Sequence, residues 1–554
     1  MRGREVFMQS LVAHGVRHVF GNPGTTENAL LDSLIDYPSI EYLVHLHEGV
    51  AVGAASYYAR ATGRTGVVNL HAAPGLGNGI GMMYNALRAN APMVVTAGQQ
   101  DTRLLRREPM LAHDLVAMAA PVSKWSTQLQ SADEVDAVMR RAFMTAREAP
   151  CGPVFVSLPV DVMEQQTENA ALPPCGPPRG AAPDARALAD ACALIKAAHA
   201  PVIVVSDEVA RTGAAADLVR LAERIGAPVW HQGLRGHVSF PGAHAHARAG
   251  LPFDVAGIRK MLDGADLVLL VGGAFFEELW FAPGSPFPQG ARVVQIVSSP
   301  RPLAYSHAVD VDLVAGMGAA LCAIDDAIAA QTDAAWRAAA GRRSAQLAAQ
   351  KARDTAAYQE RVEKAWARAP ISIPRAMAEL RKSTPAKALL VEEAITASVD
   401  FAAAFQVDAP DAYFGSRGGG IGQAVAGAIG ASIGHPGRPV LCVSGDGSAM
   451  YSITALWTAA HHELPIVFVI LVNREYRVLK QNLDIYRQRF DAPSEKPYPH
   501  MELAQPALRF VELAAGMGVP GVRVSRPDEI AGAIEQAFAA GAPRLVEIEI
   551  ESKR

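Results

Sequence analysis

The stretch that decides the fold is PVLCVSGDGSAMYSITALWTAAHHELPIVFVILVN, residues 439 to 473. Its ends hold two apolar runs of strand length, Val440–Ser444 and Pro465–Val472, and a glycine-rich turn and a helical segment lie between them. A strand, a helix and a second parallel strand form a right-handed unit whose two strand ends meet at one sheet edge. We therefore expect Asp446 and Asn473 to lie side by side.

These two side chains suit a metal-bound diphosphate. Mg²⁺ prefers oxygen ligands in octahedral geometry, and a carboxylate, an amide oxygen, a backbone carbonyl, phosphate oxygens and water provide them. Gly445 and Gly447 let the backbone approach a diphosphate, and the Ser448 hydroxyl with the amides at the helix start can donate to it. The alternative is a tight strand-to-helix turn in which Asp446 is an N-cap without a ligand. The asparagine at the next strand end favours the metal site.

The same alternation of apolar runs and helical patterns extends along the chain and predicts an α/β fold with parallel sheets flanked by helices. Strands are expected at Arg17–Phe20, Glu41–His47, Gly66–His71, Pro92–Ala97, Pro201–Val205, Pro228–Trp230, Leu267–Val271, Arg292–Ile296, Ala388–Glu392 and Arg544–Ile550, and the stretch PVFVSLPV at residues 153–160 is also strand-like. A linker rich in Pro, Gly and Ala at Glu164–Asp184 and an Ala-rich charged helix near Thr332–Arg368 separate three expected domains. Their ranges are 1–165, 185–330 and 370–554.

Composition excludes several classes of protein. The 554 residues are 50% hydrophobic and 19% charged, with a net charge of -4, which is globular and lacks the basic excess of nucleic-acid binders. The five cysteines are scattered without a C-x-x-C pair, so neither a disulfide framework nor a zinc site is expected. The N-terminus does not resemble a signal peptide, and no stretch of 18 apolar residues appears. We expect a cytoplasmic protein without membrane or nucleic-acid partners.

The turn Gly445–Ser448 followed by Asn473 resembles the diphosphate-binding signature of thiamine diphosphate enzymes. Four further stretches resemble benzoylformate decarboxylases in particular: VFGNPGTTE, HEGVAVGAASYYARATG, VNLHAAPGLGNGIGMMYNALRANAPMVVTAGQQ and SITALWTAA. The resemblance covers nearly the whole chain. It implies an N-terminal pyrimidine-binding domain, a middle domain and a C-terminal diphosphate-binding domain, with thiamine diphosphate and Mg²⁺ as cofactors.

Three groups follow the first three strands and should share one sheet edge: the turn Gly21–Glu27, Glu48 and His71. The resemblance implies that Glu48 bonds the pyrimidine ring and promotes the tautomer that activates the thiazolium. It also implies that His71 handles protons or the substrate carboxylate, and that Thr25 replaces a substrate-contacting serine. The alternatives are an ordinary glutamate at a helix start and a loop histidine. His45 and His47 are expected to pack around the site.

The resemblance also assigns cofactor contacts in the C-terminal part. In Gly418–Gly422, Ile421 would support the bent cofactor, and the carbonyl of the preceding glycine, Gly420, would accept from its amino group. The backbone oxygen of Glu475 would complete the Mg²⁺ set. By position, three more residues match cofactor-contacting ones: Glu393, Thr396 and Tyr476.

Two departures concern the substrate. The middle-domain histidine of the family falls at Leu279, and the pocket aromatic falls at Asn482. The surrounding run Arg474, Arg477, Lys480, Asn482, Arg487 is polar and basic. It is either a solvated helix face or a lid that attracts an anionic substrate.

The leading hypothesis is non-oxidative decarboxylation of a benzoylformate-like 2-oxo acid to an aldehyde and CO₂. A carboligase or lyase of the acetolactate synthase or 2-hydroxyacyl lyase kind is the second hypothesis. A non-catalytic cofactor-binding protein is the third. A nicotinamide dehydrogenase is disfavoured, because Gly418–Gly422 is not followed by an acidic strand end about 20 residues on. The resemblance implies a homodimer or homotetramer with the active site between subunits.

Overall fold

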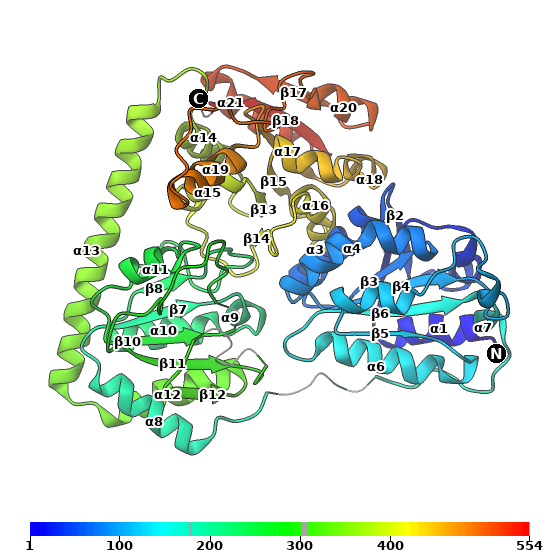
Figure 1. Cartoon of the computed structure of the whole chain (residues 1–554), viewed down its shortest axis with the longest axis horizontal. Helices are drawn as coiled ribbons and strands as arrows, with labels where there is room; N and C mark the ends of the chain where they lie inside the picture. The colour runs from blue at the N-terminus through cyan, green and yellow to red at the C-terminus, as the bar shows by residue number, and fades with distance from the viewer. Residues whose placement is uncertain (175, 177–179, 274, 302–306, 553–554) are drawn as a thin grey trace. The chain divides into compact units, whose positions relative to one another are not determined.

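The computed structural model describes residues 1–174, 176, 180–273, 275–301 and 307–552. It contains three six-stranded parallel sheets flanked by helices, which confirms the predicted α/β class (Figure 1). The first sheet and five strands of the third sheet belong to one compact unit, whereas the second sheet and the short edge strand Tyr413–Gly415 of the third sheet belong to another. Cys175 and residues 177–179 of the expected linker lie outside the described residues. The four described cysteines are free.

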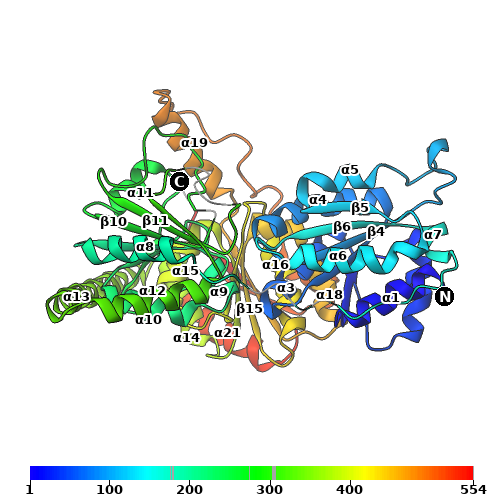
Figure 2. The same cartoon turned by 90° about the horizontal axis from the view of Figure 1, so that it is seen from below.

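The first sheet has the strand order β2-β1-β3-β4-β6-β5. Its strands are β1 (His18–Gly21), β2 (Glu41–Val44), β3 (Gly66–Leu70), β4 (Met93–Gln99), β5 (Trp125–Gln128) and β6 (Pro153–Pro159). Helices cover both faces, so the central strands are continuously buried (Figures 1 and 2). These helices are α1 (Gly3–Ala13), α2 (Asn28–Ser33), α3 (Glu48–Thr62), α4 (Ala72–Arg88), α5 (Leu115–Ala119), α6 (Val135–Arg147) and α7 (Val160–Glu164).

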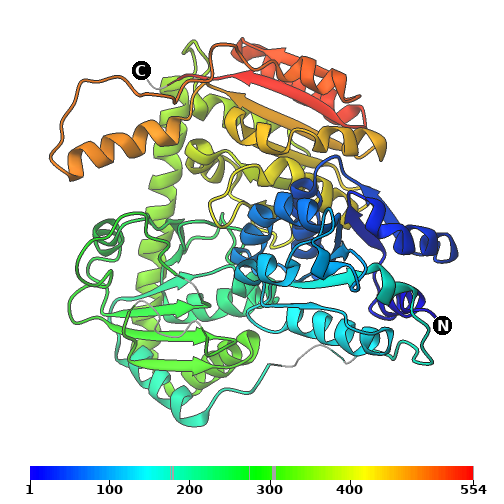
Figure 3. The same ribbon diagram turned by 45° about the vertical axis from the view of Figure 1, so that its right-hand side comes forward.

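The third sheet has the order β14-β13-β15-β16-β18-β17 (Figure 3). Its strands are β13 (Leu389–Glu393), β14 (Tyr413–Gly415), β15 (Val440–Gly445), β16 (Ile466–Val472), β17 (Gly521–Val524) and β18 (Arg544–Glu549). Its helices are α14 (Ile373–Ser383), α15 (Ser398–Phe405), α16 (Gln423–Gly434), α17 (Asp446–Ala449), α18 (Ala455–His461), α19 (Arg477–Arg489), α20 (Phe510–Gly516) and α21 (Ile530–Ala539). Gly445 pairs with Leu471, so β15 and β16 end together, as the sequence predicts.

The first and third sheets are joined mainly by α3 and α16, which lie side by side (Figure 1). Small residues allow the close approach. A Cβ on Gly427 would lie 2.5 Å from the Tyr57 ring, and one on Gly430 would overlap the Ala54 carbonyl. The Thr458 hydroxyl also donates to the Val44 carbonyl over 3.1 Å. The two strand-end regions are therefore parts of one packed body.

The second sheet has the order β12-β11-β10-β7-β8-β9. Its strands are β7 (Pro201–Val205), β8 (Val229–His231), β9 (Ala247–Gly250), β10 (Leu267–Val271), β11 (Arg292–Val297) and β12 (Val311–Val314). The helices of this part are α8 (Ala185–Ala197), α9 (Glu208–Arg211), α10 (Ala215–Ile225), α11 (Val255–Met261), α12 (Met317–Gln331) and α13 (Ala334–Ala365). Across the described residues, no helix is both long enough and apolar enough to cross a membrane.

Candidate active site at the strand ends

The turn after β1 places a buried carboxylate beside His71. Glu27 is 3% exposed and accepts from the backbone amides of Gly24 and Gly98, each over 3.0 Å, and from the Thr26 hydroxyl over 2.6 Å. Its Oε2 lies 2.9 Å from Nδ1 of His71, the residue that caps the start of α4. With three donors already on Glu27, this carboxylate is held in one orientation.

The carboxylate also selects the form of the imidazole. Because Nδ1 faces an acceptor, it carries the proton in the neutral ring, and Nε2 is left free to accept one. The His71 side chain is 22% exposed, so it is open to a small molecule while its partner Glu27 is not. Sequence reasoning did not single out Glu27, the last residue of the VFGNPGTTE stretch, although it is the only charged residue of that turn.

The structure distinguishes the two threonines of this turn. Thr25 is exposed, whereas Thr26 is buried and its hydroxyl lies 3.3 Å from Nδ1 of His71. Thr25 was the residue expected to contact substrate. Within this chain, the threonine beside the histidine is Thr26.

Glu48 begins α3 and is 7% exposed. Asn78 of α4 donates to its Oε2 over 3.0 Å, and a Cβ on Gly75 would lie 3.0 Å from its Oε1. His47 is the N-cap, and its ring accepts from the amide of Gly49. His45 is fully buried in packing, as expected. Helix α4 therefore holds both His71, at its start, and the Glu48 carboxylate, through Asn78.

At the third sheet, Asp446 bridges the ends of β15 and β16. It is 3% exposed, and its oxygens accept from the amides of Gly447 over 2.8 Å and Arg474 over 2.7 Å. Asn473 lies in the same turn, where its side-chain oxygen accepts from the Glu475 amide over 3.0 Å. The two residues that the sequence places side by side are thus joined through the backbone of one turn.

The Asp446 surroundings fit a cation and a diphosphate. Burial raises the pKa of Asp446 to about 6, and a metal ion would favour the ionised form that burial disfavours. A Cβ on Gly445 would meet nothing within 4 Å, so space lies open beside the turn, whereas one on Gly447 would strike the Tyr476 ring at 2.5 Å. The described residues hold no cluster of three His, Cys, Asp or Glu side chains suited to a metal. The expected set needs only one such side chain.

The glycine loop before α16 is held from two sides. Gly418, Gly419 and Gly422 have φ of 80°, 85° and 93°, which other residues rarely adopt. The Gly420 carbonyl accepts from Asn85 over 3.3 Å and from Gln423 over 2.6 Å. This oxygen therefore has two donors within the chain, and its expected contact with the cofactor stays a prediction.

Glu393 also serves this loop. Its two oxygens accept from the amides of Gly422 and Ala424, each over 3.0 Å, and burial raises its pKa to about 8. Thr396 lies in the short helical turn that follows β13. Glu393 thus fixes the end of the glycine loop and the start of α16 by accepting hydrogen bonds from their backbone amides.

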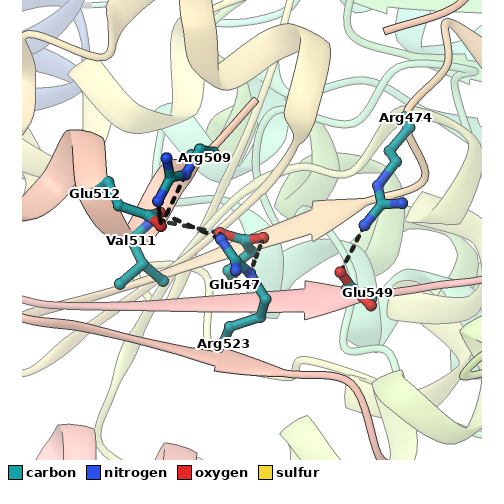
Figure 4. Close-up of polar contacts among 7 residues, drawn as sticks. All are labelled: Arg474, Arg509, Val511, Glu512, Arg523, Glu547 and Glu549. Atoms are coloured by element: carbon teal, nitrogen blue, oxygen red, sulfur yellow. Dashed lines mark hydrogen bonds and ion pairs between the residues drawn. The ribbon is translucent and has the colours of Figure 1, made fainter. Parts of the chain in front are cut away.

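The basic residues in and before α19 form mainly internal ion pairs, which neither alternative from the sequence described. Lys480 and Arg477 are buried and bind the Glu475 carboxylate, and Lys480 also binds Glu502. Arg474 reaches Glu549 at the end of β18 over 2.7 Å (Figure 4). Three of the four expected cations therefore have internal carboxylate partners.

Figure 4 also shows Glu547 of β18 beside Arg523, with Arg509 and Glu512 adjacent. These contacts brace the outer strands β18 and β17. In the second unit, Leu279, at the position of the family's histidine, is 64% exposed.

The chain combines parallel sheets, a turn of the kind that binds a diphosphate and a separate acid–histidine pair. These features are typical of α/β enzymes that use a cofactor. Three family models match: the N-terminal TPP binding domain of thiamine pyrophosphate enzymes at residues 1–118, their central domain at 188–324 and their C-terminal TPP binding domain at 395–548. The benzoylformate decarboxylase of Pseudomonas aeruginosa is 34% identical, covering 97% of this chain and 96% of that protein. The chain therefore belongs to the thiamine pyrophosphate enzymes.

Other relatives span two activities. The large subunit of acetolactate synthase isozyme 3 of Escherichia coli is 27% identical, covering 97% of this chain and 92% of its own. The thiamine diphosphate-dependent 4-hydroxybenzoylformate decarboxylase of Rhodococcus jostii RHA1 superposes with a TM-score of 0.86 at 30% identity, covering both chains completely. The benzoylformate decarboxylase of Polynucleobacter necessarius gives 0.86 at 25%, covering 99% and 98%.

Proposed function

We propose that the chain decarboxylates a 2-oxo acid without oxidation, releasing an aldehyde and CO₂, with thiamine diphosphate and Mg²⁺ as cofactors. The observation that supports this most is the His71–Glu27 pair, because it presents an oriented proton carrier beside the strand end that holds Glu48. The full-length likeness to benzoylformate decarboxylases supports the same reaction.

The residues divide the work as follows. Asp446, Asn473 and the backbone oxygen of Glu475 would hold Mg²⁺, and the amides after Gly445 with the Ser448 hydroxyl would hold the diphosphate. Thiamine diphosphate, when bound, supplies the electron sink for the pair released as CO₂ leaves. Glu48, oriented by Asn78, would share a proton with the pyrimidine ring.

His71 would move protons at its free Nε2 during substrate addition and product release, because Glu27 keeps Nδ1 protonated. Thr25, exposed at the turn, is the proposed substrate contact. Ile421 would support the cofactor's bent shape, and Tyr476, beside the diphosphate turn, and Thr396, in the turn after β13, are further proposed cofactor contacts. Gly419 and Gly420 are both exposed, but the Gly420 carbonyl already has two donors within the chain, so we assign the amino-group acceptor to the neighbouring Gly419.

The remaining expectations are part of this proposal: domains at 1–165, 185–330 and 370–554, a cytoplasmic location and a homodimer or homotetramer. The substrate is a small 2-oxo acid. Leu279 and Asn482 stand where the family has a histidine and an aromatic residue, so both aromatic and aliphatic 2-oxo acids are candidate substrates.

The test is CO₂ release from aromatic and aliphatic 2-oxo acids, with and without thiamine diphosphate and Mg²⁺. We expect release from at least one acid only when both cofactors are present, and loss of release in Glu48→Gln. Glu41→Gln is the matched control, because Glu41 starts the β2 strand that precedes Glu48 in the chain and its side chain is 53% exposed. Full activity without cofactor contradicts the proposal.

A carboligase of the acetolactate synthase kind is the second candidate, favoured by the relatives with that name and by Leu279 in place of a proton-carrying residue. Incubation with pyruvate and an aldehyde acceptor separates the two reactions. A ligated 2-hydroxy ketone as the main product would support the carboligase, and free aldehyde would support the decarboxylase.

A further inference from the structure

Helix α4 carries three polar groups at seven-residue spacing: His71 at its N-cap, Asn78 and Asn85. Seven residues are nearly two helical turns, so these groups share one face and rise about 10 Å from one to the next. The first faces Glu27 and the second donates to Glu48. The third, Asn85, reaches the glycine loop of the third sheet.

Both ends of the Asn85 side-chain amide bind the backbone of a single residue, Gly420. Its Nδ2 donates to the Gly420 carbonyl over 3.3 Å, and its Oδ1 accepts from the Gly420 amide over 3.2 Å. Asn85 is 5% exposed, whereas Gly420 is exposed, so a buried side chain holds a backbone segment at the surface of the site. Neighbouring glycines with positive φ leave the loop few restraints of its own.

The fit between the two residues is close. A Cβ on Gly420 would lie 2.7 Å from Nδ2, 2.8 Å from Oδ1 and 3.2 Å from Cγ of Asn85, and these are its three nearest atoms. A Cβ on Gly418 would lie 2.9 Å from the same Oδ1. The loop therefore lies against Asn85 and, at Gly418, also against Arg88 of the same helix.

We propose that Asn85 is a positioning residue that holds the backbone of Gly420 against α4, so that Gly419 and Ile421 on either side of it face the cofactor. The inference rests on the proposed cofactor contacts of this loop. It adds that α4 joins the loop rigidly to the strand ends that carry Glu48 and His71.

The first test needs no cofactor: hydrogen exchange of the peptide spanning residues 418–424 in the cofactor-free protein. Asn85→Ala removes both bonds and should raise the exchange rate of this peptide about tenfold. Asn90→Gly is the matched control, because it also deletes an asparagine amide near the end of α4, and Asn90 has φ of 50°, which glycine adopts. It should leave the peptide unchanged. Unchanged exchange in Asn85→Ala overturns the proposal.

The second test asks whether the two hydrogen bonds between Asn85 and Gly420, here called the Asn85–Gly420 clamp, contribute to cofactor affinity. Thiamine diphosphate affinity, measured by calorimetry with Mg²⁺, should fall about tenfold in Asn85→Ala and stay unchanged in Asn90→Gly. Faster exchange with unchanged affinity overturns the positioning role. Absence of 2-oxo acid turnover in the wild-type chain would refute the proposed reaction only, since exchange and affinity do not depend on turnover.

A double-mutant cycle gives an internal check, should Asn85→Ala fold poorly. Gly420→Ala places its methyl group against Asn85 alone among its nearest atoms, so it should weaken cofactor binding in the presence of Asn85. In the Asn85→Ala background the same change should cost much less, because the clash is gone. Additive effects of the two changes contradict the clamp.

Discussion

Glu27→Gln is the most informative single substitution, because every oxygen of Glu27 already has a donor. Oε2 faces the Gly24 amide and Nδ1 of His71, and Oε1 faces the Gly98 amide and the Thr26 hydroxyl. A glutamine must direct its NH₂ at one of these sides. In either orientation, the NH₂ meets a backbone N–H that then has no acceptor.

An unsatisfied buried donor costs about 1–3 kcal/mol, so we expect Glu27→Gln to lower the free energy of unfolding by that amount. Catalysis should fall further. If the NH₂ faces His71, it donates to Nδ1, the ring proton moves to Nε2, and the proposed proton acceptor is lost. General acid–base catalysis contributes about 100-fold to 10,000-fold, and the loss in kcat should lie in that range.

The assays are urea unfolding and steady-state CO₂ release at saturating cofactor. Glu41→Gln is the control, since Glu41 is also a carboxylate near a histidine, His18, but is 53% exposed. It should change the free energy of unfolding by less than about 1 kcal/mol and leave kcat intact. A Glu27→Gln variant with wild-type kcat would refute the role given to the His71–Glu27 pair.

Further expectations concern stability. Burial lowers the pKa of His45 from 6.5 to about 4, so the unfolded chain binds this proton first and stability falls as pH drops through that window. Between pH 7.5 and 5 this amounts to about 2 kcal/mol, which His45→Leu should remove from the pH dependence of urea unfolding; an unaltered pH dependence contradicts this. Gly427→Ala drives a methyl into Tyr57 and should cost about 1–3 kcal/mol of unfolding free energy. Gly532→Ala, also helical but with open space around it, should stabilise slightly, and equal effects of the two would contradict the close α3–α16 packing.

The central strands could be predicted closely, because both faces of a covered parallel sheet are apolar. Pro201–Val205 and Leu267–Val271 coincide with β7 and β10, and Arg292–Ile296 falls one residue short of β11. The strands missed by sequence analysis all lie at or near sheet edges: β5, β9, β12, β14 and β17. Edge strands are partly solvated and short, so their sequences, such as WSTQ in β5, carry no apolar run.

The site was predictable where topology alone brings residues together. Asp446 and Asn473 follow neighbouring parallel strands, and Glu48 and His71 follow the strands on either side of β1. Contacts between distant side chains were not predictable. The Asn85–Gly420 clamp spans 335 positions, and the sequence pattern that suggested a lid gave no sign of Glu475 as a buried partner.

The most direct test of the whole account is a crystal structure of the protein with thiamine diphosphate and Mg²⁺ bound. We expect Asp446, Asn473 and the Glu475 carbonyl on the metal, and Glu48 of the same or a second copy within hydrogen-bonding distance of the pyrimidine ring. A cofactor that binds elsewhere, or a Glu48 carboxylate out of reach of the ring in every copy of the assembly, would contradict the account.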